Sequence, residues 1–268
     1  MVVQHNMAAS NANRQLGIST NTLSKSTEKL SSGYRINRAA DDAAGLSISE
    51  KMRSQIRGLN KASSNAQDGI SAIQTAEGAL NEAHSILQRM NELATQSAND
   101  TNTTADRTAV QSEVNALTNE LSRIASTSQF NTQNLLDGTF TGKNLQVGAL
   151  ENQKITISIG NMNAKALGVD SLDVKSFIKA GSAMTLIQKA ISKVSGQRSD
   201  LGALQNRLEH TVNNLDNISE NTQTAESRIR DTDMASEMVQ YSATSIIQQA
   251  GQSMLAQANS QTQGVLSL

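Results

Sequence analysis

The chain lacks cysteine, proline and tryptophan, and it holds only two tyrosines and three phenylalanines among its 268 residues. Without cysteine there is no disulfide, no thiolate metal ligand and no thiol nucleophile. Without proline, long helices do not meet their strongest breaker. Because aromatic side chains usually dominate compact cores, this chain must bury Leu, Ile, Val, Met and Ala instead, which suits the packing of helix on helix.

An excess of charge of one sign is also missing, since 23 basic and 24 acidic residues give a net charge of −1. No overall field therefore attracts nucleic acid or an anionic membrane. No run of about 20 apolar residues occurs, which argues against a membrane span. The first residues lack the basic and apolar regions of a signal peptide. We expect neither nucleic acid nor a membrane among the partners.

Both ends of the chain carry weak apolar stripes at helical spacing. Near the N-terminus the leucines recur every seven residues, at Leu16, Leu23 and Leu30. Over residues 233–260 one face is marked by Met234, Met238, Tyr241, Ile246, Ala250 and Met254. Stripes this thin bury too little apolar area to hold a helix in place alone. The pattern predicts two terminal helices that pair with each other and with copies of themselves.

Between the ends, apolar residues follow a strong 4-3 repeat over residues 73–94, 110–124 and 187–215. This spacing is typical of helices that pack along a shared seam. The leucines expected in that core seam are Leu80, Leu87, Leu117, Leu121, Leu201, Leu208 and Leu215. We predict a mainly α fold, a long antiparallel helical bundle of coiled-coil type formed by the N- and C-terminal halves.

Residues 126–180 differ from the rest because Gly and Asn interrupt them and apolar residues alternate. Leu145 and Val147 form one alternating run, and residues 155–159 form the other, with isoleucine at every second position. A period of two indicates strands, and the gap between the runs predicts a small β-hairpin. The fold class is therefore a helical bundle with a β-hairpin insert.

Residue patterns of catalysis and metal binding are missing. None of the three histidines lies in an HExxH motif, and neither a phosphate-binding glycine loop nor GxSxG occurs. Glu82 and His84 are two positions apart, so a helix would point them about 200° apart, which does not suit a shared metal. We expect no enzyme activity, no catalytic residue, no metal and no cofactor.

The segment KLSSGYRINRAADDAAGLSISEKMRSQIRG, residues 29–58, is densest in arginine and aspartate. Asp41 and Asp42 beside Arg35 and Arg38 can be interpreted as an acid–base or metal pair. They can also be a charged turn in which Asp41 or Asp42 caps a helix that starts near residue 43. We favour the capped turn, since no histidine, cysteine or glycine-rich loop supports catalysis.

Several long blocks resemble the bacterial flagellin family, in the order in which that family carries them. In the first half these are LSSGYRINRAADDAAGLSISEKMRSQIRGL and NAQDGISAIQTAEGALNEAHSILQRMNELATQSAN. In the second half they are LGALQNRLEHTVNNL, AESRIRDTDMASEMVQYSATSIIQQAGQSMLAQAN and the ending GVLSL. The resemblance covers about residues 1–137 and 183–268.

This resemblance implies two layers of a filament subunit. Residues 1–42 and 233–268 would form D0, the helices of the inner core, and residues 43–232 would form D1, with the hairpin region at about 126–180. The variable stretch is short, so no D2 or D3 domain is expected. Arg35, Arg38, Asp41 and Asp42 would then belong to a connector between layers and subunits.

The resemblance also implies a function and a set of partners. The chain would be the structural subunit that self-assembles into the extracellular flagellar filament for motility, after export as an unfolded chain by the flagellar secretion system. Besides other copies of itself, its partners would be an export chaperone, the filament cap, hook–filament junction proteins and, in a vertebrate host, the flagellin-sensing Toll-like receptor. The alternatives are a hook–filament junction protein, or an immune ligand or adhesin without motility.

The receptor implied by the resemblance would bind the D1 layer. The matching positions are Arg89, Leu93 and Gln96 in LQRMNELATQ, and Glu113 on the returning helix. An arginine facing a glutamate around a leucine gives a polar patch with an apolar anchor. Filament packing could use the same residues, and Leu93 could belong to the D1 core, since it lies three positions from Met90.

Overall fold

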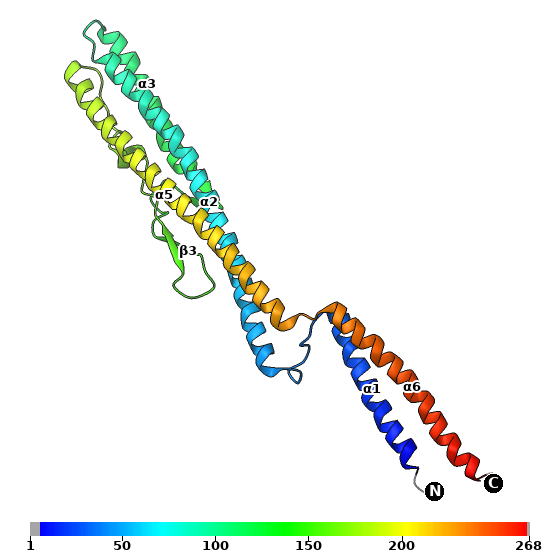
Figure 1. The fold of residues 1–268 in the computed structure, drawn as a ribbon. Coiled ribbons are helices and arrows are strands. Elements are labelled where there is room, and N and C mark those ends of the chain that lie inside the picture. Colours follow the sequence, from blue (N-terminus) through cyan, green and yellow to red (C-terminus); the bar gives the residue numbers. More distant parts are fainter. Residues whose placement is uncertain (1–5, 267–268) are drawn as a thin grey trace. The chain divides into compact units, whose positions relative to one another are not determined.

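The computed structural model describes residues 6–266, and their side chains as far as residue 261. Within this range the helices are α1 (Met7–Ser32), α2 (Ala43–Ser97), α3 (Thr104–Thr127), α4 (Ala164–Leu167), α5 (Phe177–Arg230) and α6 (Met234–Leu266). The strands are β1 (Gln129–Phe130), β2 (Gln133–Asn134), β3 (Lys143–Gln146) and β4 (Lys154–Ile157). Figure 1 shows long helices and a small β insert, which confirms the predicted fold class.

The chain divides into two compact units, each made of segments that pack together. The terminal unit consists of residues 1–56 and 220–268, and the central unit consists of residues 57–219. The division falls inside α2 and α5, so each of these helices contributes to both units. The D0 and D1 boundaries expected from the sequence stay a prediction. Residues 1–5 and 267–268 of the predicted D0 layer, with the end of the GVLSL motif, lie outside the described residues.

In the central unit, α2 and α5 run antiparallel. The Ser97 hydroxyl at the end of α2 donates to the Val174 carbonyl just before α5. Toward the other end of the unit, the Ser63 hydroxyl donates to Asp216, over 3.0 Å. The end of α2 thus lies beside the start of α5, and the early part of α2 lies beside the late part of α5. The N- and C-terminal halves therefore form one bundle.

The core of this bundle follows the 4-3 repeat. Leu80 and Leu87 of α2 and Leu201 and Leu208 of α5 are fully buried in one apolar cluster with residues of α3 and the β insert. Leu121 lies in the same cluster, Leu117 is half-buried at its edge, and Leu215 is buried in a second, smaller cluster. The leucine positions are thus the ones at which the helices face one another.

The turn between α2 and α3 is fixed by a capping box. The Thr103 hydroxyl accepts a hydrogen bond from the Asp106 backbone N–H, over 3.3 Å, and the Asp106 carboxylate accepts one from the Thr103 N–H, over 2.9 Å. The Thr103 hydroxyl also donates to the Asp106 carboxylate over 2.7 Å, and this bond is the main cause that lowers the Asp106 pKa. A short, capped turn returns α3 antiparallel to α2, as the polar link in the sequence predicts.

The β insert contains the predicted hairpin and a second strand pair. In β3 and β4, Leu145 pairs with Ile155 in an antiparallel register, and Ile155 and Ile157 face the core. The pair of β1 and β2 was not predicted, because two-residue strands show no alternation. Its turn residues Asn131 and Thr132 have φ of 48° and 62°, the left-handed geometry that tight hairpins need.

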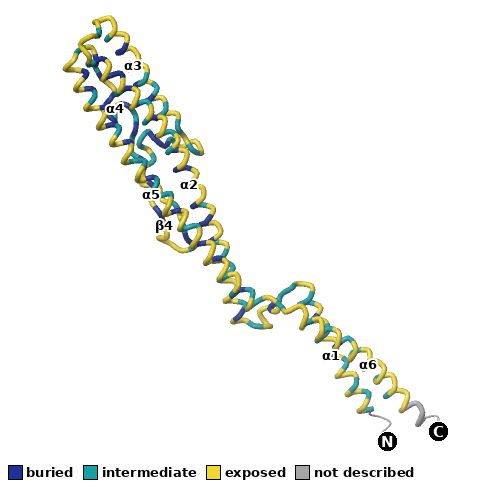
Figure 2. The backbone as a smooth tube through the Cα atoms, turned by 45° about the horizontal axis from the view of Figure 1, so that its top comes forward, coloured by how far each residue is buried: buried dark blue, intermediate teal, exposed yellow. Residues whose placement is uncertain are grey.

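In the terminal unit, α1 packs against α6 through small polar side chains. The buried residues of the pair are Ser19 and Ser26 of α1 and Thr244 of α6, and the α1 leucines are only half-buried. Figure 2 shows the pair as mostly exposed or intermediate along its length. On α6, the large apolar side chains that are exposed are Met234, Met238, Val239, Ile246, Ile247 and Met254. Of the apolar positions predicted on α6, Met234, Met238, Ile246 and Met254 therefore stay exposed in the helix pair.

Among the described residues, no helix has a stretch that is long and apolar enough to cross a membrane.

Candidate functional site

Two short connectors join the helices of the terminal unit, and they are hydrogen-bonded to each other. One connector links α1 to α2 and starts at Gly33, whose φ of 76° ends α1 in the left-handed conformation. The other links α5 to α6. The Arg35 N–H donates to the Arg230 carbonyl over 2.7 Å, and the Thr232 N–H donates to the Gly33 carbonyl over 3.0 Å. Tyr34 and Asp231 form an isolated antiparallel bridge between them.

The Tyr34 ring is the centre of a cluster of charged residues around the connectors. The Arg230 guanidinium lies 4.7 Å from the ring centroid and that of Arg53 lies 5.7 Å from it, both within cation–π range. Arg53 also donates to the Tyr34 hydroxyl, over 3.2 Å. An aromatic ring held by two guanidinium groups fixes residues from α2, α5 and a connector around one point.

Carboxylates balance these arginines. Arg230 pairs with Glu50 over 3.1 Å, and Arg53 lies 3.8 Å from Glu226, which is a buried residue. Of the two, the Arg53–Glu226 pair is the better shielded from water, so its separation would leave a charge in a poorly hydrated place. The cluster therefore stabilises one arrangement of the connectors.

The four residues predicted as a connector all lie here, but they do not meet at one point. The Arg35 guanidinium donates to the Ile229 carbonyl. Arg38 pairs with Glu28 of α1 over 3.0 Å, with its own side chain largely exposed, so this pair contributes little to stability. They attach the connector to α5 and to α1 respectively.

The two aspartates of the connector accept hydrogen bonds from the backbone. Asp41 accepts from the N–H of Asn37 and of Arg38, over 3.3 and 3.0 Å, and the Arg38 bond is the main cause that lowers the Asp41 pKa. Asp42 accepts from the Gly45 N–H over 2.8 Å in the first turn of α2. Each aspartate organises a turn, which agrees with the capped-turn interpretation.

Among the described residues, no group of three or more His, Asp or Glu side chains lies close enough together to hold a metal ion. Asp41 and Asp42 accept hydrogen bonds from backbone N–H groups instead.

Sequence reasoning missed the partners that complete the cluster. Glu226 and Arg230 come from the motif AESRIRDTDM, at the far end of the sequence from Tyr34. Nothing local links the two segments, because the pairing depends on how α1, α2, α5 and α6 come together. The only available signal was that each motif holds both acidic and basic residues.

The predicted receptor-binding residues lie in the central unit, on α2 and α3. The Arg89 guanidinium donates to one oxygen of Glu113, from Nε over 3.1 Å and from Nη2 over 2.9 Å, and it also pairs with Glu92 over 3.1 Å. The bond to Glu113 is the main cause that raises the Arg89 pKa. Both partners are exposed, so α2 and α3 present a polar patch of matched charges.

Gln96 and Leu93, the other two predicted receptor residues, differ in their exposure to solvent. Gln96 is exposed near the end of α2. Leu93 is 2% exposed and packs in the apolar core of the central unit, which is the alternative that its spacing from Met90 left open. The exposed patch is thus made by Arg89, Gln96 and Glu113, with Leu93 beneath it.

Comparison with known proteins gives matches along the whole chain. The model of the bacterial flagellin N-terminal helical region matches residues 3–141, and that of the C-terminal helical region matches residues 184–268. A flagellin of Halalkalibacterium halodurans is 56% identical, and the match covers 100% of this chain and 99% of the relative. The flagellar filament 33 kDa core protein of Treponema phagedenis is 51% identical over 100% of this chain and 99% of its own.

A solved structure is also similar. The crystal structure of Bacillus cereus flagellin is 32% identical, with a TM-score of 0.50, over 57% of this chain and 88% of that one.

Proposed function

The chain belongs to the bacterial flagellin family, and from this premise we propose that it is the structural subunit of a flagellar filament, assembled from copies of itself. The family matches cover both the N-terminal and the C-terminal segments that make up the terminal unit. The relative from Treponema phagedenis carries the name of a filament core protein. Arg35, Arg38, Asp41 and Asp42 are proposed to hold the connectors in the geometry that the filament uses.

The observation that carries this proposal is the placement of apolar side chains in the terminal unit. The contact between α1 and α6 buries serine and threonine, whereas Met238, Ile246 and Met254 lie on exposed surface. Exposed apolar patches mark interaction surfaces. Copies of the same chain are the partner that fits, since a helical polymer repeats one heterologous contact without closing into a ring.

Electron microscopy of the purified chain tests this function. After seeding with short filament fragments or addition of a precipitant, long tubes of uniform diameter are expected, because the exposed apolar faces are then buried between copies. Negative staining measures the length and the diameter. Chains that stay monomeric under both conditions contradict the role of filament subunit and favour a hook–filament junction protein.

The route to the filament is part of the proposal. The chain is exported unfolded through the flagellar secretion system, with an export chaperone, the filament cap and hook–filament junction proteins as partners. The composition supports this, since a chain without cysteine or proline carries no disulfide and no prolyl isomerisation that would slow folding after export. The location of the assembled protein is the extracellular filament, where it serves motility.

Recognition by the flagellin-sensing Toll-like receptor is a second function, and the patch of Arg89, Gln96 and Glu113 favours it. Arg89 offers a planar guanidinium to a partner, and Glu113 and Glu92 hold it in place. Arginine is frequent among residues that dominate binding energy. Leu93 supports the patch from the core.

Replacing Arg89 with alanine is expected to lower the potency of the soluble chain in a receptor-signalling assay by about tenfold or more, the effect of losing one dominant contact. Arg123→Ala is the matched control, because Arg123 is also an exposed arginine that pairs with a glutamate, Glu120, on α3. Equal potency of the Arg89 variant and the wild type removes Arg89 from the receptor site.

A further inference from the structure

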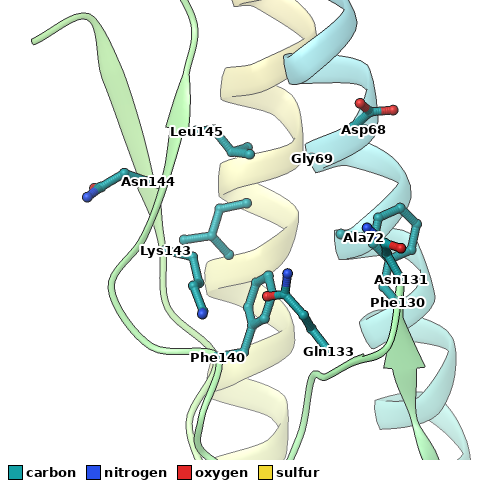
Figure 3. A pocket seen from close by; sticks show the side chains of 11 residues that line it. Asp68, Gly69, Ala72, Phe130, Asn131, Gln133, Phe140, Lys143, Asn144 and Leu145 are labelled. Carbon is teal, nitrogen blue, oxygen red and sulfur yellow. The ribbon is translucent and has the colours of Figure 1, made fainter.

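A pocket of about 250 Å³ lies in the central unit, between α2 and the β insert. Phe130, Phe140 and Leu145 supply its apolar lining, and Asp68 stands at its edge on α2 (Figure 3). Gly69 forms the helix side, where an added Cβ would come 2.2 Å from a Leu145 methyl group. A larger residue at position 69 would therefore displace the Leu145 side chain that lines the pocket. We call this the hairpin pocket.

An exposed pair of apolar residues stands at the other end of the same unit. Phe177 and Ile178 open α5, and they are 59% and 80% exposed. Neither has a covering element in its own chain among the described residues. We call this pair the α5 tip. Large apolar side chains side by side on a surface are costly in water unless a partner covers them.

The α5 tip cannot enter the hairpin pocket of its own chain. Its neighbour Val174 is hydrogen-bonded to Ser97 at the end of α2, whereas the pocket borders Gly69 of the same helix. These two positions of α2 are about 40 Å apart at 1.5 Å per residue. A contact between the two surfaces must therefore join different copies, and it leaves a free tip and a free pocket at the two ends of the pair.

Size and charge agree with this pairing. An apolar cavity of about 150 Å³ accepts a benzene ring, so the hairpin pocket is large enough for the Phe177 side chain. Lys175 lies two residues before Phe177, and Asp68 lies beside Gly69; both are exposed and form no ion pair among the described residues. The opposite charges of Lys175 and Asp68, each close to one of the two surfaces, suit a contact between neighbouring copies.

We propose that the α5 tip of one chain inserts into the hairpin pocket of the next copy, with Phe177 in the pocket and Lys175 paired to Asp68. The inference rests on the proposed filament function, and it names the two surfaces that join successive copies. It is a head-to-tail contact, so it adds chains without limit.

Cross-linking of the polymer tests the contact, and the lack of cysteine makes the chain suited to it. In the double variant Asp68→Cys with Lys175→Cys, Phe177 stays in place. A bismaleimide is chosen that spans about the combined length of a lysine and an aspartate side chain. It is expected to give a ladder of dimers, trimers and longer chains from the polymer, and no cross-linked product from the soluble chain. The matched control is Glu82→Cys with Lys175→Cys, since Glu82 is an exposed acidic residue about 21 Å further along α2.

The outcomes separate this contact from the filament function. A ladder in the Asp68 variant and not in the Glu82 control supports the contact. Polymers that cross-link no better through Asp68 than through Glu82 overturn the contact alone. A wild-type chain that never polymerises overturns the filament function, and the contact with it.

A second test measures the critical concentration for polymerisation with variants that contain no introduced cysteine. Phe177→Ala is expected to raise the critical concentration for polymerisation at least tenfold and to leave the melting temperature of the soluble chain unchanged, because Phe177 is exposed there. Leu186→Ala, a truncation at a partly exposed position of the same helix, is expected to leave the critical concentration near the wild-type value. An unchanged critical concentration for Phe177→Ala contradicts the contact.

Discussion

Replacing Ile246 with glutamate is expected to prevent filament formation at the wild-type critical concentration and to leave the melting temperature of the soluble chain unchanged. In the soluble chain the Ile246 side chain is 66% exposed, so the new carboxylate is hydrated and costs nothing. In the proposed filament this surface of α6 would be covered by other copies, and an unpaired buried charge costs several kcal/mol for each subunit. Since every subunit carries this cost, the critical concentration rises by about a hundredfold or more.

Sedimentation of seeded samples over a range of concentrations measures that change. Gln249→Glu is the control, because Gln249 is exposed on the same helix and is already polar; it is expected to polymerise nearly as the wild type does. Filaments of the Ile246 variant at the wild-type critical concentration would show that this face of α6 stays in water after assembly.

Replacing Leu208 with aspartate is expected to destabilise the central unit by about 4 kcal/mol or more, an effect typical of a buried unpaired charge. Leu208 is 0% exposed and lies in the core that α2, α3 and α5 share. For a unit of this size each kcal/mol lowers the melting temperature by about 2–4 °C. A fall of about 8 °C or more is therefore expected in thermal unfolding followed by circular dichroism.

The control for Leu208 is His210→Asp, two positions along on the exposed side of α5. The same carboxylate is hydrated there, so the melting temperature is expected to change by little. If the two variants melt together, the 4-3 repeat of α5 does not define the core, and the seam is placed wrongly.

The bundle could be predicted from the sequence because each of its long helices carries its own core residues at regular, local spacing. Each turn of α2 and α5 places a Leu, Ile, Val or Ala on the same face, so the 4-3 spacing records the burial directly. Leu80 and Leu208 show this most simply. The β3–β4 hairpin was predictable for the same reason, since the alternation at residues 155–159 records which face meets the helices.

The connector cluster was predictable only in part. Asp42 caps α2 through a local bond, since it accepts from the N–H three residues further on. The sequence predicted a cap at Asp41 or Asp42 without deciding between them. The contacts of Tyr34 with Arg53 and Arg230 join segments from α2 and α5, and no local pattern encodes them. The same holds for the exposed α6 face, because apolar spacing marks a surface for burial without showing whether α1 or another copy covers it.

The pairing of the two connectors has a mechanical consequence. Each is a short stretch of chain without helical hydrogen bonds, and alone it would stretch easily under tension. The backbone bonds from Arg35 to Arg230 and from Thr232 to Gly33 tie them side by side, so a pull on one is shared by the other. In the filament proposed for this chain, rotation against a viscous medium would load the subunits continually, and a doubled link resists such loads with less extension than two separate ones.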